Sequence, residues 1–273
     1  MACKIIDFHT HAFPDSIAGR AMKTLLAEAE GAKAYLDGTL SALLKSMDDN
    51  GIEKSVLCNI ATKPSQFEPI LKWAKQVSSE RIIPLPSVHP DDPNLLQNLD
   101  LVKSEGFLGI KLHPYYQDFI LDDSGMYKLY EKCEKLSLFV IVHTGFDIAF
   151  ERIRKADPKK ILKMTHDFPD LTLISTHFGA WEDWDDVERY LIGKPIFMEI
   201  SFALEYLSPE QARRMLLNHN SDFLLFGTDS PWSSQQHTLR LLNDLKLPEE
   251  LLRKILYKNS ARILHLDEHD FQY

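Results

Sequence analysis

Histidines gather at the ends of apolar segments in this sequence. Six of the 11 histidines lie at or just beyond the end of a short apolar run: His9, His11, His89, His113, His143 and His177. His9 and His11 are separated by one residue, so in an extended chain their side chains point to the same face, about 7 Å apart along the strand. Taken alone, such a pair is better explained as surface or capping histidines.

Three further residues favour a metal site over that explanation. His143, His177 and Asp229 each follow an apolar run, and the ends of parallel strands line a common mouth. Imidazole nitrogens together with a carboxylate suit zinc or a similar divalent ion. Three or four protein ligands that leave an open position are typical of a catalytic site rather than a structural one.

Four polar residues near these strand ends have two interpretations each. His89 and His113 are both followed by proline, and each either faces the site or only ends its strand. Lys111 shares the face of His113, and it is either a core lysine that reaches toward the mouth, or an anchor for a substrate anion or a modified, metal-bridging lysine. Glu199 is either an acid that supports the metal ligands or part of a structural ion pair, because a lone buried carboxylate is costly. The other histidines fall in predicted helices or tails and receive no role: His166, His219, His237, His265 and His269.

The elements that must position these residues are eight β-rich apolar runs, at 4–8, 54–60, 81–88, 106–112, 138–142, 171–176, 195–201 and 223–228. They alternate with helix-length amphipathic segments, one of which ends at Gly51. Ser208 and Asp157, each followed by proline, are predicted N-caps. Eight βα units in about 250 residues predict a single (β/α)₈ TIM barrel, with the metal site at the C-terminal ends of the strands. An open doubly wound sheet more often has a glycine-rich first turn, which is absent here.

Composition limits the domain count and the partners. The chain has 273 residues, of which 44% are hydrophobic and 26% charged, and a formal net charge of −9. No linker or low-complexity tract divides it, so we expect one domain over 1–273. The acidic balance argues against nucleic acid and anionic membranes as partners and favours a small molecule. Three scattered cysteines and an N-terminus without a leader-like stretch predict buried thiols and a cytoplasmic protein.

The sequence resembles the amidohydrolase superfamily, in particular the amidohydrolase-related branch of TIM-barrel hydrolases that also contains aromatic-acid decarboxylases. The resemblance spans essentially the whole chain and rests on the order and strand positions of six motifs: DFHTH at 7–11, GIKLHP at 109–114, VHTG at 142–145, THFG at 176–179, GTDSPW at 227–232 and NSARILHL at 259–266.

The resemblance implies one divalent metal ion, Zn²⁺ in the first instance or Mn²⁺, held by His9, His11, His143 and Asp229. In binuclear relatives His177 and a carboxylated lysine at the position of Lys111 would bind a second ion. Asp229 would accept a proton from water, and His177 would orient the water or stabilise the developing oxyanion. The chain has no room for a cap domain, so the mouth would be covered by its own loops, by a neighbouring subunit or not at all, and we expect a homodimer.

Three functions remain open from the sequence. The first is hydrolysis of a C–N, lactone or other ester bond of a small organic substrate, and the second is nonoxidative decarboxylation of an aromatic or unsaturated acid. A binding barrel without catalysis ranks last. His113, Lys111 and Trp232 are predicted to contact the substrate. Arg152 and Arg154 either bind a substrate carboxylate or form a solvated charged face, and the second interpretation is preferred.

Overall fold

The expected strands are all present in the computed structural model, which describes residues 4–29 and 31–266. Its eight strands are β1 Ile6–Thr10, β2 Lys54–Cys58, β3 Ile82–Leu85, β4 Gly109–Leu112, β5 Phe139–Val142, β6 Leu173–Ser175, β7 Phe197–Glu199 and β8 Leu224–Leu225. Seven of them lie inside the predicted segments. The exception is β1, which begins and ends two residues later than predicted, so that His9 lies within the strand rather than after it.

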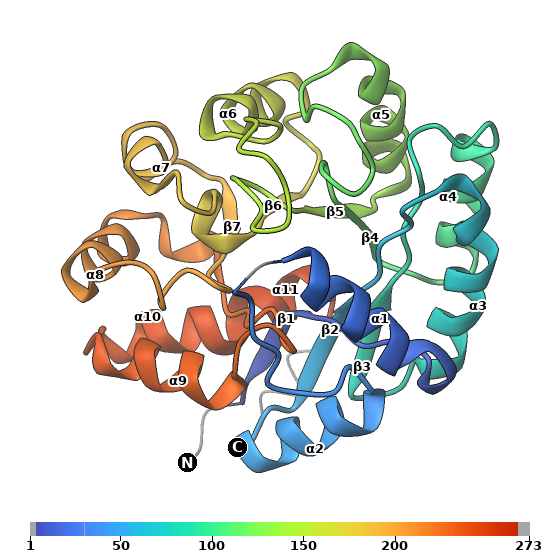
Figure 1. Ribbon diagram of the computed structural model, residues 1–273. Helices are drawn as coiled ribbons and strands as arrows, with labels where there is room; N and C mark the ends of the chain where they lie inside the picture. Colours follow the sequence, from blue (N-terminus) through green and yellow to red (C-terminus); the bar gives the residue numbers. More distant parts are fainter. Residues whose placement is uncertain (1–3, 30, 267–273) are drawn as a thin grey trace.

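The strands close into a barrel. Two parallel sheets, with orders β1-β2-β3 and β4-β5-β6-β7-β8, make up the wall. Backbone hydrogen bonds join them at both edges, because the Lys111 N–H donates to the carbonyl of Pro86 at 3.1 Å and the Phe8 N–H donates to the carbonyl of Phe226 at 2.8 Å. The predicted TIM barrel is therefore confirmed, and Figure 1 shows its helices surrounding the strands.

The helices occupy the predicted connections. Their bounds are α2 Leu40–Asn50, α3 Phe67–Val77, α4 Leu95–Ser104, α5 Tyr127–Leu136, α6 Pro158–Asp167, α7 Trp184–Tyr190, α8 Pro209–Asn218, α9 Gln235–Asp244, α10 Glu249–Arg253 and α11 Asn259–Ile263, with a π-helical turn at Lys254–Lys258 and 3₁₀ turns at Pro64–Gln66, Ser124–Met126, His177–Gly179 and Ser221–Phe223. The predicted caps are confirmed, since the Ser208 hydroxyl accepts from the Gln211 N–H and the Asp157 carboxylate accepts from two N–H groups of α6. Gly51 ends α2 in the left-handed conformation, with φ of 66°.

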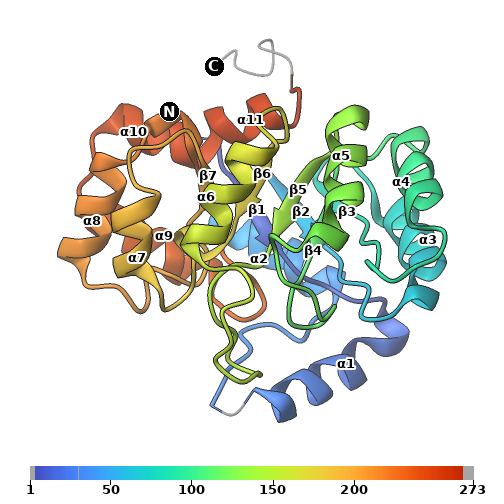
Figure 2. The ribbon, with the colours of Figure 1, turned by 90° about the horizontal axis from the view of Figure 1, so that it is seen from above.

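One helix lies outside this ring. Helix α1, Asp15–Glu28, follows β1 and precedes α2, so two helices fill the first connection. Figure 2 shows α1 set apart from the other helices, across one end of the barrel. Its residues border the same cavity as His9 and Asp229. A helix of this chain itself therefore lies over the mouth, for which the sequence left open its own loops, a neighbouring subunit or no cover.

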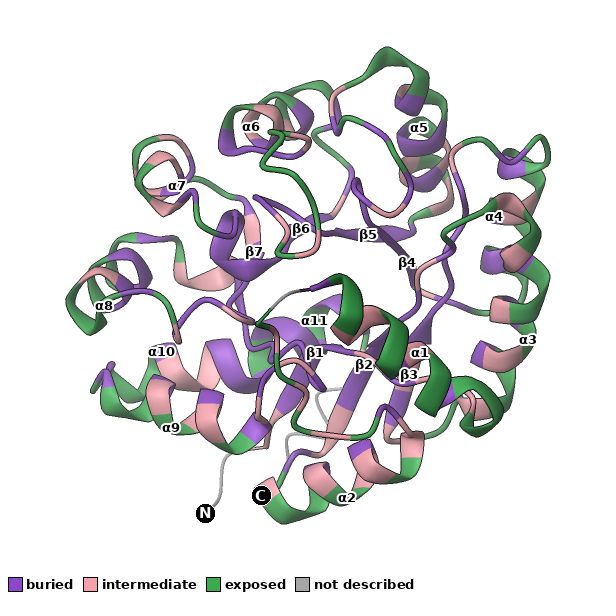
Figure 3. Cartoon of the chain, viewed as in Figure 1, coloured by how far each residue is buried: buried purple, intermediate pink, exposed green. Residues whose placement is uncertain are grey.

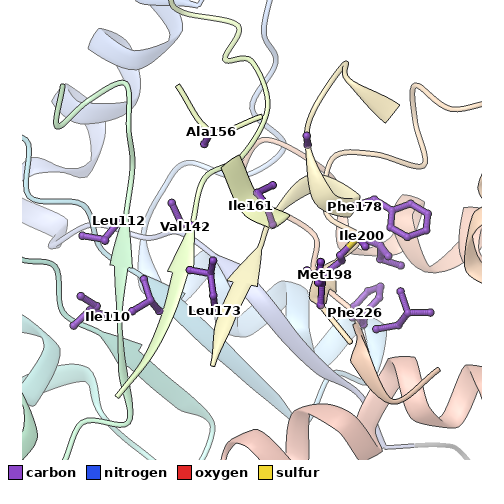
Figure 4. Close-up of a cluster of buried hydrophobic side chains, with 14 of the residues drawn as sticks. Ile110, Leu112, Val142, Ala156, Ile161, Leu173, Phe178, Met198, Ile200 and Phe226 are labelled. Carbon is purple, nitrogen blue, oxygen red and sulfur yellow. The ribbon is translucent and has the colours of Figure 1, made fainter. Parts of the chain in front are cut away.

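Apolar side chains fill the barrel and the space between barrel and helices. An inner cluster includes Phe8, Phe139 and Ile141, and an outer cluster includes Ile110 and Val142. Figure 4 shows part of the outer cluster, and Figure 3 shows that the strands are buried whereas much of α1 is exposed. This alternation along each strand turns the polar neighbours of the outer residues toward the barrel interior.

Two further features of the chain are the state of its cysteines and the length and polarity of its helices. Cys58 and Cys133 are buried free thiols, as expected, and Cys3 lies outside the described residues. None of the helices in residues 4–29 and 31–266 is long and apolar enough to cross a membrane.

Candidate metal centre

The predicted site residues meet at the C-terminal ends of the strands. A cavity of about 650 Å³ is lined by every residue given a metal, catalytic or substrate role above: His9, His11, Lys111, His113, His143, His177, Asp229 and Trp232. His89 is absent from this lining, and its Nδ1 instead accepts from the backbone N–H of Asp91 at 3.2 Å. His113 and Lys111 therefore line the cavity, whereas His89 does not.

Three of these residues bring their ligand atoms together. Nε2 of His9 lies 3.1 Å from Nε2 of His11. Oδ1 of Asp229 lies 3.0 Å from Nε2 of His11 and 3.3 Å from Nε2 of His9. The register of the β1–β2 pair shifts between Asp7 and Thr10, which is the irregularity that lets this end of β1 turn its side chains inward.

The outer ring nitrogens of His9 and His11 are held by acceptors. Nδ1 of His9 lies 2.9 Å from a carboxylate oxygen of Glu199, and Nδ1 of His11 lies 2.8 Å from the carbonyl oxygen of Cys58. A carbonyl oxygen can only accept, so Nδ1 of His11 carries the proton and donates, and Nδ1 of His9 does the same toward the ionised form of Glu199. Each Nε2 then presents a lone pair to the cluster, which is the arrangement that a metal-binding histidine needs.

The same reasoning applies on the other side of the cavity. Nε2 of His143 donates to the carbonyl of Phe146 at 2.9 Å, and Nδ1 of His177 donates to the carbonyl of Ser201 at 3.2 Å. The remaining nitrogens, Nδ1 of His143 and Nε2 of His177, face each other at 3.0 Å. Burial lowers the pKa of both imidazoles well below the ordinary value. Each ring therefore keeps a nitrogen lone pair that can accept a hydrogen bond or bind a cation.

Glu199 joins the two halves of the site. One of its oxygens accepts from Nδ1 of His9, from the His177 N–H at 3.1 Å and from the Ser201 hydroxyl at 2.8 Å, and the other accepts from the Ser201 N–H at 2.7 Å. The side chain has no exposed surface, and burial raises its pKa to about 7. These contacts make Glu199 the shared partner of His9 and His177.

His177 has an unusual backbone. It begins a 3₁₀ turn directly after β6 and has a φ of 56°, and Phe178 follows with a φ of 54°. Left-handed conformations cost free energy in residues other than glycine and persist where surrounding contacts hold them. The hydrogen bond from the His177 N–H to Glu199 is one such contact, and it aims the imidazole into the cavity.

Lys111 lies at the centre of the cluster. Its Nζ is 3.1 Å from Nε2 of His9, and the side chain is 1% exposed. Among the described residues no carboxylate lies within ion-pair distance of it, and burial lowers its pKa. Lys111 is therefore a buried lysine whose Nζ reaches His9 in the cavity, which agrees with both interpretations given above.

Asp147 is a residue that the sequence interpretation missed. Its Oδ2 lies 3.4 Å from Nε2 of His113 and 3.6 Å from Nε2 of His143. The rings of His113 and His143 stack with centroids 4.1 Å apart. The position of Asp147, four residues after His143 in the same predicted loop, was the available clue. Ser201, two residues past Glu199, was missed as well.

Two arginines of the same loop are engaged elsewhere. Arg152 pairs with Glu182, and Arg154 pairs with Asp183 at 2.8 Å and with Asp186 at 3.1 Å. Their side chains are about half exposed. These contacts agree with the preferred interpretation of both residues as part of a solvated charged face.

The model of the amidohydrolase family matches residues 6–266. The chain belongs to the amidohydrolase family. No curated protein matches it.

Among solved structures, a TIM-barrel protein of uncharacterised function from Bordetella bronchiseptica is 22% identical, with 96% of this chain and 98% of that one covered and a TM-score of 0.73. The 5-carboxyvanillate decarboxylase of Sphingomonas paucimobilis is 12% identical, with 97% and 100% covered and a TM-score of 0.69. A dihydroxybenzoic acid decarboxylase from Polaromonas, with bound manganese and the inhibitor 2-nitroresorcinol, is 13% identical, with 97% and 98% covered and a TM-score of 0.69. At these sequence identities, the similarity to the three structures supports the TIM-barrel fold of this chain.

Proposed function

We propose that this amidohydrolase-family protein is a divalent-metal-dependent hydrolase that cleaves a C–N, lactone or other ester bond of a small organic substrate. The observation that carries the proposal is the convergence of Nε2 of His9, Nε2 of His11 and Oδ1 of Asp229 beside a cavity. His9, His11, His143 and Asp229 would hold the ion, for which we propose one Zn²⁺ per chain. When bound, such an ion lowers the pKa of water and polarises a carbonyl group.

The residues of the chain would move the protons. Oδ1 of Asp229 faces the histidines, which leaves Oδ2 to take a proton from water and to return it to the leaving group. Nε2 of His177 carries a lone pair toward the same space. From there it would orient the attacking water through a hydrogen bond, while Glu199 keeps His9 in the required tautomer.

The proposed count of one metal depends on Lys111. With one ion, Lys111 would stay unmodified beside Nε2 of His9. Two ions would require carboxylation of Lys111 and would make His177 a ligand. Elemental analysis of the purified protein, in moles of metal per chain, distinguishes these arrangements.

A second candidate function is nonoxidative decarboxylation. It is favoured by the two decarboxylases among the structures of similar fold, one of which holds manganese. In this case Asp229 would deliver its proton to the ring carbon that loses the carboxyl group. The same ligands would serve both reactions, with Mn²⁺ as the alternative ion.

One experiment separates the two functions. The protein is loaded with Zn²⁺ or with Mn²⁺ and assayed for acid release from esters, lactones and amides, and for carbon dioxide release from carboxylated phenols. Hydrolysis that is lost in Asp229→Asn and retained in the matched surface variant Asp244→Asn supports the proposal. Carbon dioxide release with no hydrolysis replaces it with the second candidate, and the absence of both activities in the metal-loaded protein refutes both.

A further inference from the structure

The cavity extends well beyond the ligand cluster. It encloses about 650 Å³, which falls in the range of about 300–1,000 Å³ typical of pockets for drug-sized molecules. The titratable side chains described above line one end of it. The other end lies between α1 and the segment that leads into α3.

Helix α1 turns an apolar stripe toward this far end. Ile17, Ala21 and Leu25 recur every four residues, so they share one face of the helix, and all three line the cavity, which Arg20, Thr24 and Glu28 of the same helix also border. The neighbouring face carries Ala18 and Met22, which are buried. Ile17 is 36% exposed even though it is a large apolar residue. Figure 2 shows α1 set apart from the barrel, and Ile17 is among the residues that line the cavity.

Helix α3 supplies the opposite wall. Phe67, Leu71 and Ala74 are buried against the barrel. Ile70 and Trp73 lie on the next face of the helix, line the cavity and remain partly exposed. Two apolar helix faces thus border the same space and leave their side chains open to it.

The apolar side chains that α1 and α3 add to the lining favour a substrate with an apolar part in addition to the reacting bond. The bond that reacts must lie beside Asp229 and His177. A substrate consisting of a single ring at that position would leave the α1 and α3 walls in contact with water. Covering such walls stabilises a complex by about 25 cal/mol for each Å² of apolar surface removed from water.

We propose that the substrate carries an extended apolar group, an alkyl chain or a further ring, remote from the reacting bond, and that this group lies between α1 and α3. The inference rests on the proposed function for the position of the reacting end. It holds for a hydrolase and for a decarboxylase alike, since both reactions take place at the ligand cluster.

The test is a binding titration that does not require turnover. Linear monocarboxylates from butanoate to decanoate are titrated into the Zn²⁺-loaded protein by calorimetry. Each added methylene is expected to lower Kd about three- to fourfold. Ile70→Gln and Leu25→Gln are expected to flatten this dependence for the longer acids and to leave butanoate binding unchanged. Leu101→Gln, which changes an exposed leucine of α4 outside the cavity lining, serves as the control and should behave like the unaltered protein.

The outcomes distinguish the two proposals. A Kd that does not depend on chain length, no binding of any acid, or a dependence that survives both cavity variants overturns the apolar-group proposal. A length dependence that both variants abolish supports it, even if the protein hydrolyses none of the matching methyl esters. That last result would count against the proposed hydrolase activity alone.

Discussion

Replacing Glu199 with glutamine should weaken metal binding and leave the stability of the metal-free protein nearly unchanged. The carboxylate accepts four hydrogen bonds, three at Oε1 and one at Oε2. A glutamine amide has one oxygen, so its best placement keeps the oxygen toward His9 and turns the NH₂ group toward the Ser201 N–H. One buried donor then loses its acceptor, at about 1–3 kcal/mol, and the bond from His9 loses its charged partner, at about 1 kcal/mol.

An opposing effect acts on stability. Burial raises the pKa of Glu199 from 4.5 to about 7, so above pH 7 the folded protein carries a charge that costs roughly 3 kcal/mol relative to the unfolded chain. Glutamine removes that cost. The two effects are similar in size, so the Tm of the metal-free Glu199→Gln protein should change by only a few degrees.

Metal affinity has no such compensation. The loss of a carboxylate that orients a ligand histidine typically weakens metal binding about 10- to 100-fold. We therefore expect Kd for Zn²⁺ to rise by that factor at pH 8, measured by competition with a chromophoric chelator. Glu188→Gln, which alters a surface glutamate paired with Arg214, is the matched control. An unchanged Kd in Glu199→Gln would refute the assignment of Glu199 as the residue that positions His9.

Four further results are expected. Asp229→Asn should keep the circular dichroism spectrum of the unaltered protein while turnover falls by at least about 10²-fold, since a general base contributes about that much; substantial activity would contradict its role. Removal of metal by a chelator should abolish activity, and one equivalent of Zn²⁺ per chain should restore it, whereas a need for two would favour the binuclear site. Burial lowers the pKa of His219 to about 4, so the folded state binds fewer protons than the unfolded state between pH 6.5 and 4. The free energy of unfolding should therefore fall by about 3 kcal/mol as the pH drops through this window. In His219→Gln, the free energy of unfolding measured by urea titrations should depend less steeply on pH. Gly145→Ala should lower stability by more than about 1 kcal/mol in the same titrations, because Gly145 has a φ of 89° and an added Cβ would overlap the backbone of Trp181.

Much of the residue cluster around the cavity could be predicted from the chain. The spacing of His9 and His11 and the strand-end positions of His143, His177 and Asp229 are local features, and apolar runs locate strand ends to within a few residues. The boundaries of β1 were wrong by two residues because its pairing register shifts near Asp7. Such a shift depends on the partner strand, which a local pattern does not contain.

The roles of Lys111, His113 and His89 needed the fold. Each has the same local context, a polar residue at the end of an apolar strand, yet only Lys111 and His113 line the cavity. Their direction depends on which way each strand is turned when the barrel closes. Asp147 and Ser201 were missed for a related reason, since each contributes through contacts made across the cavity rather than through a motif.

The sequence by itself determined the barrel and the chemical types at its mouth, because strand and helix periodicity and the order of the motifs are properties of short segments. Only the tertiary structure decided the tautomers of the histidines, the link from Glu199 to both His9 and His177, and the apolar space beneath α1. These features depend on atoms brought together from residues as far apart as His9 and Glu199. These atoms come within hydrogen-bond distance only after the barrel has closed.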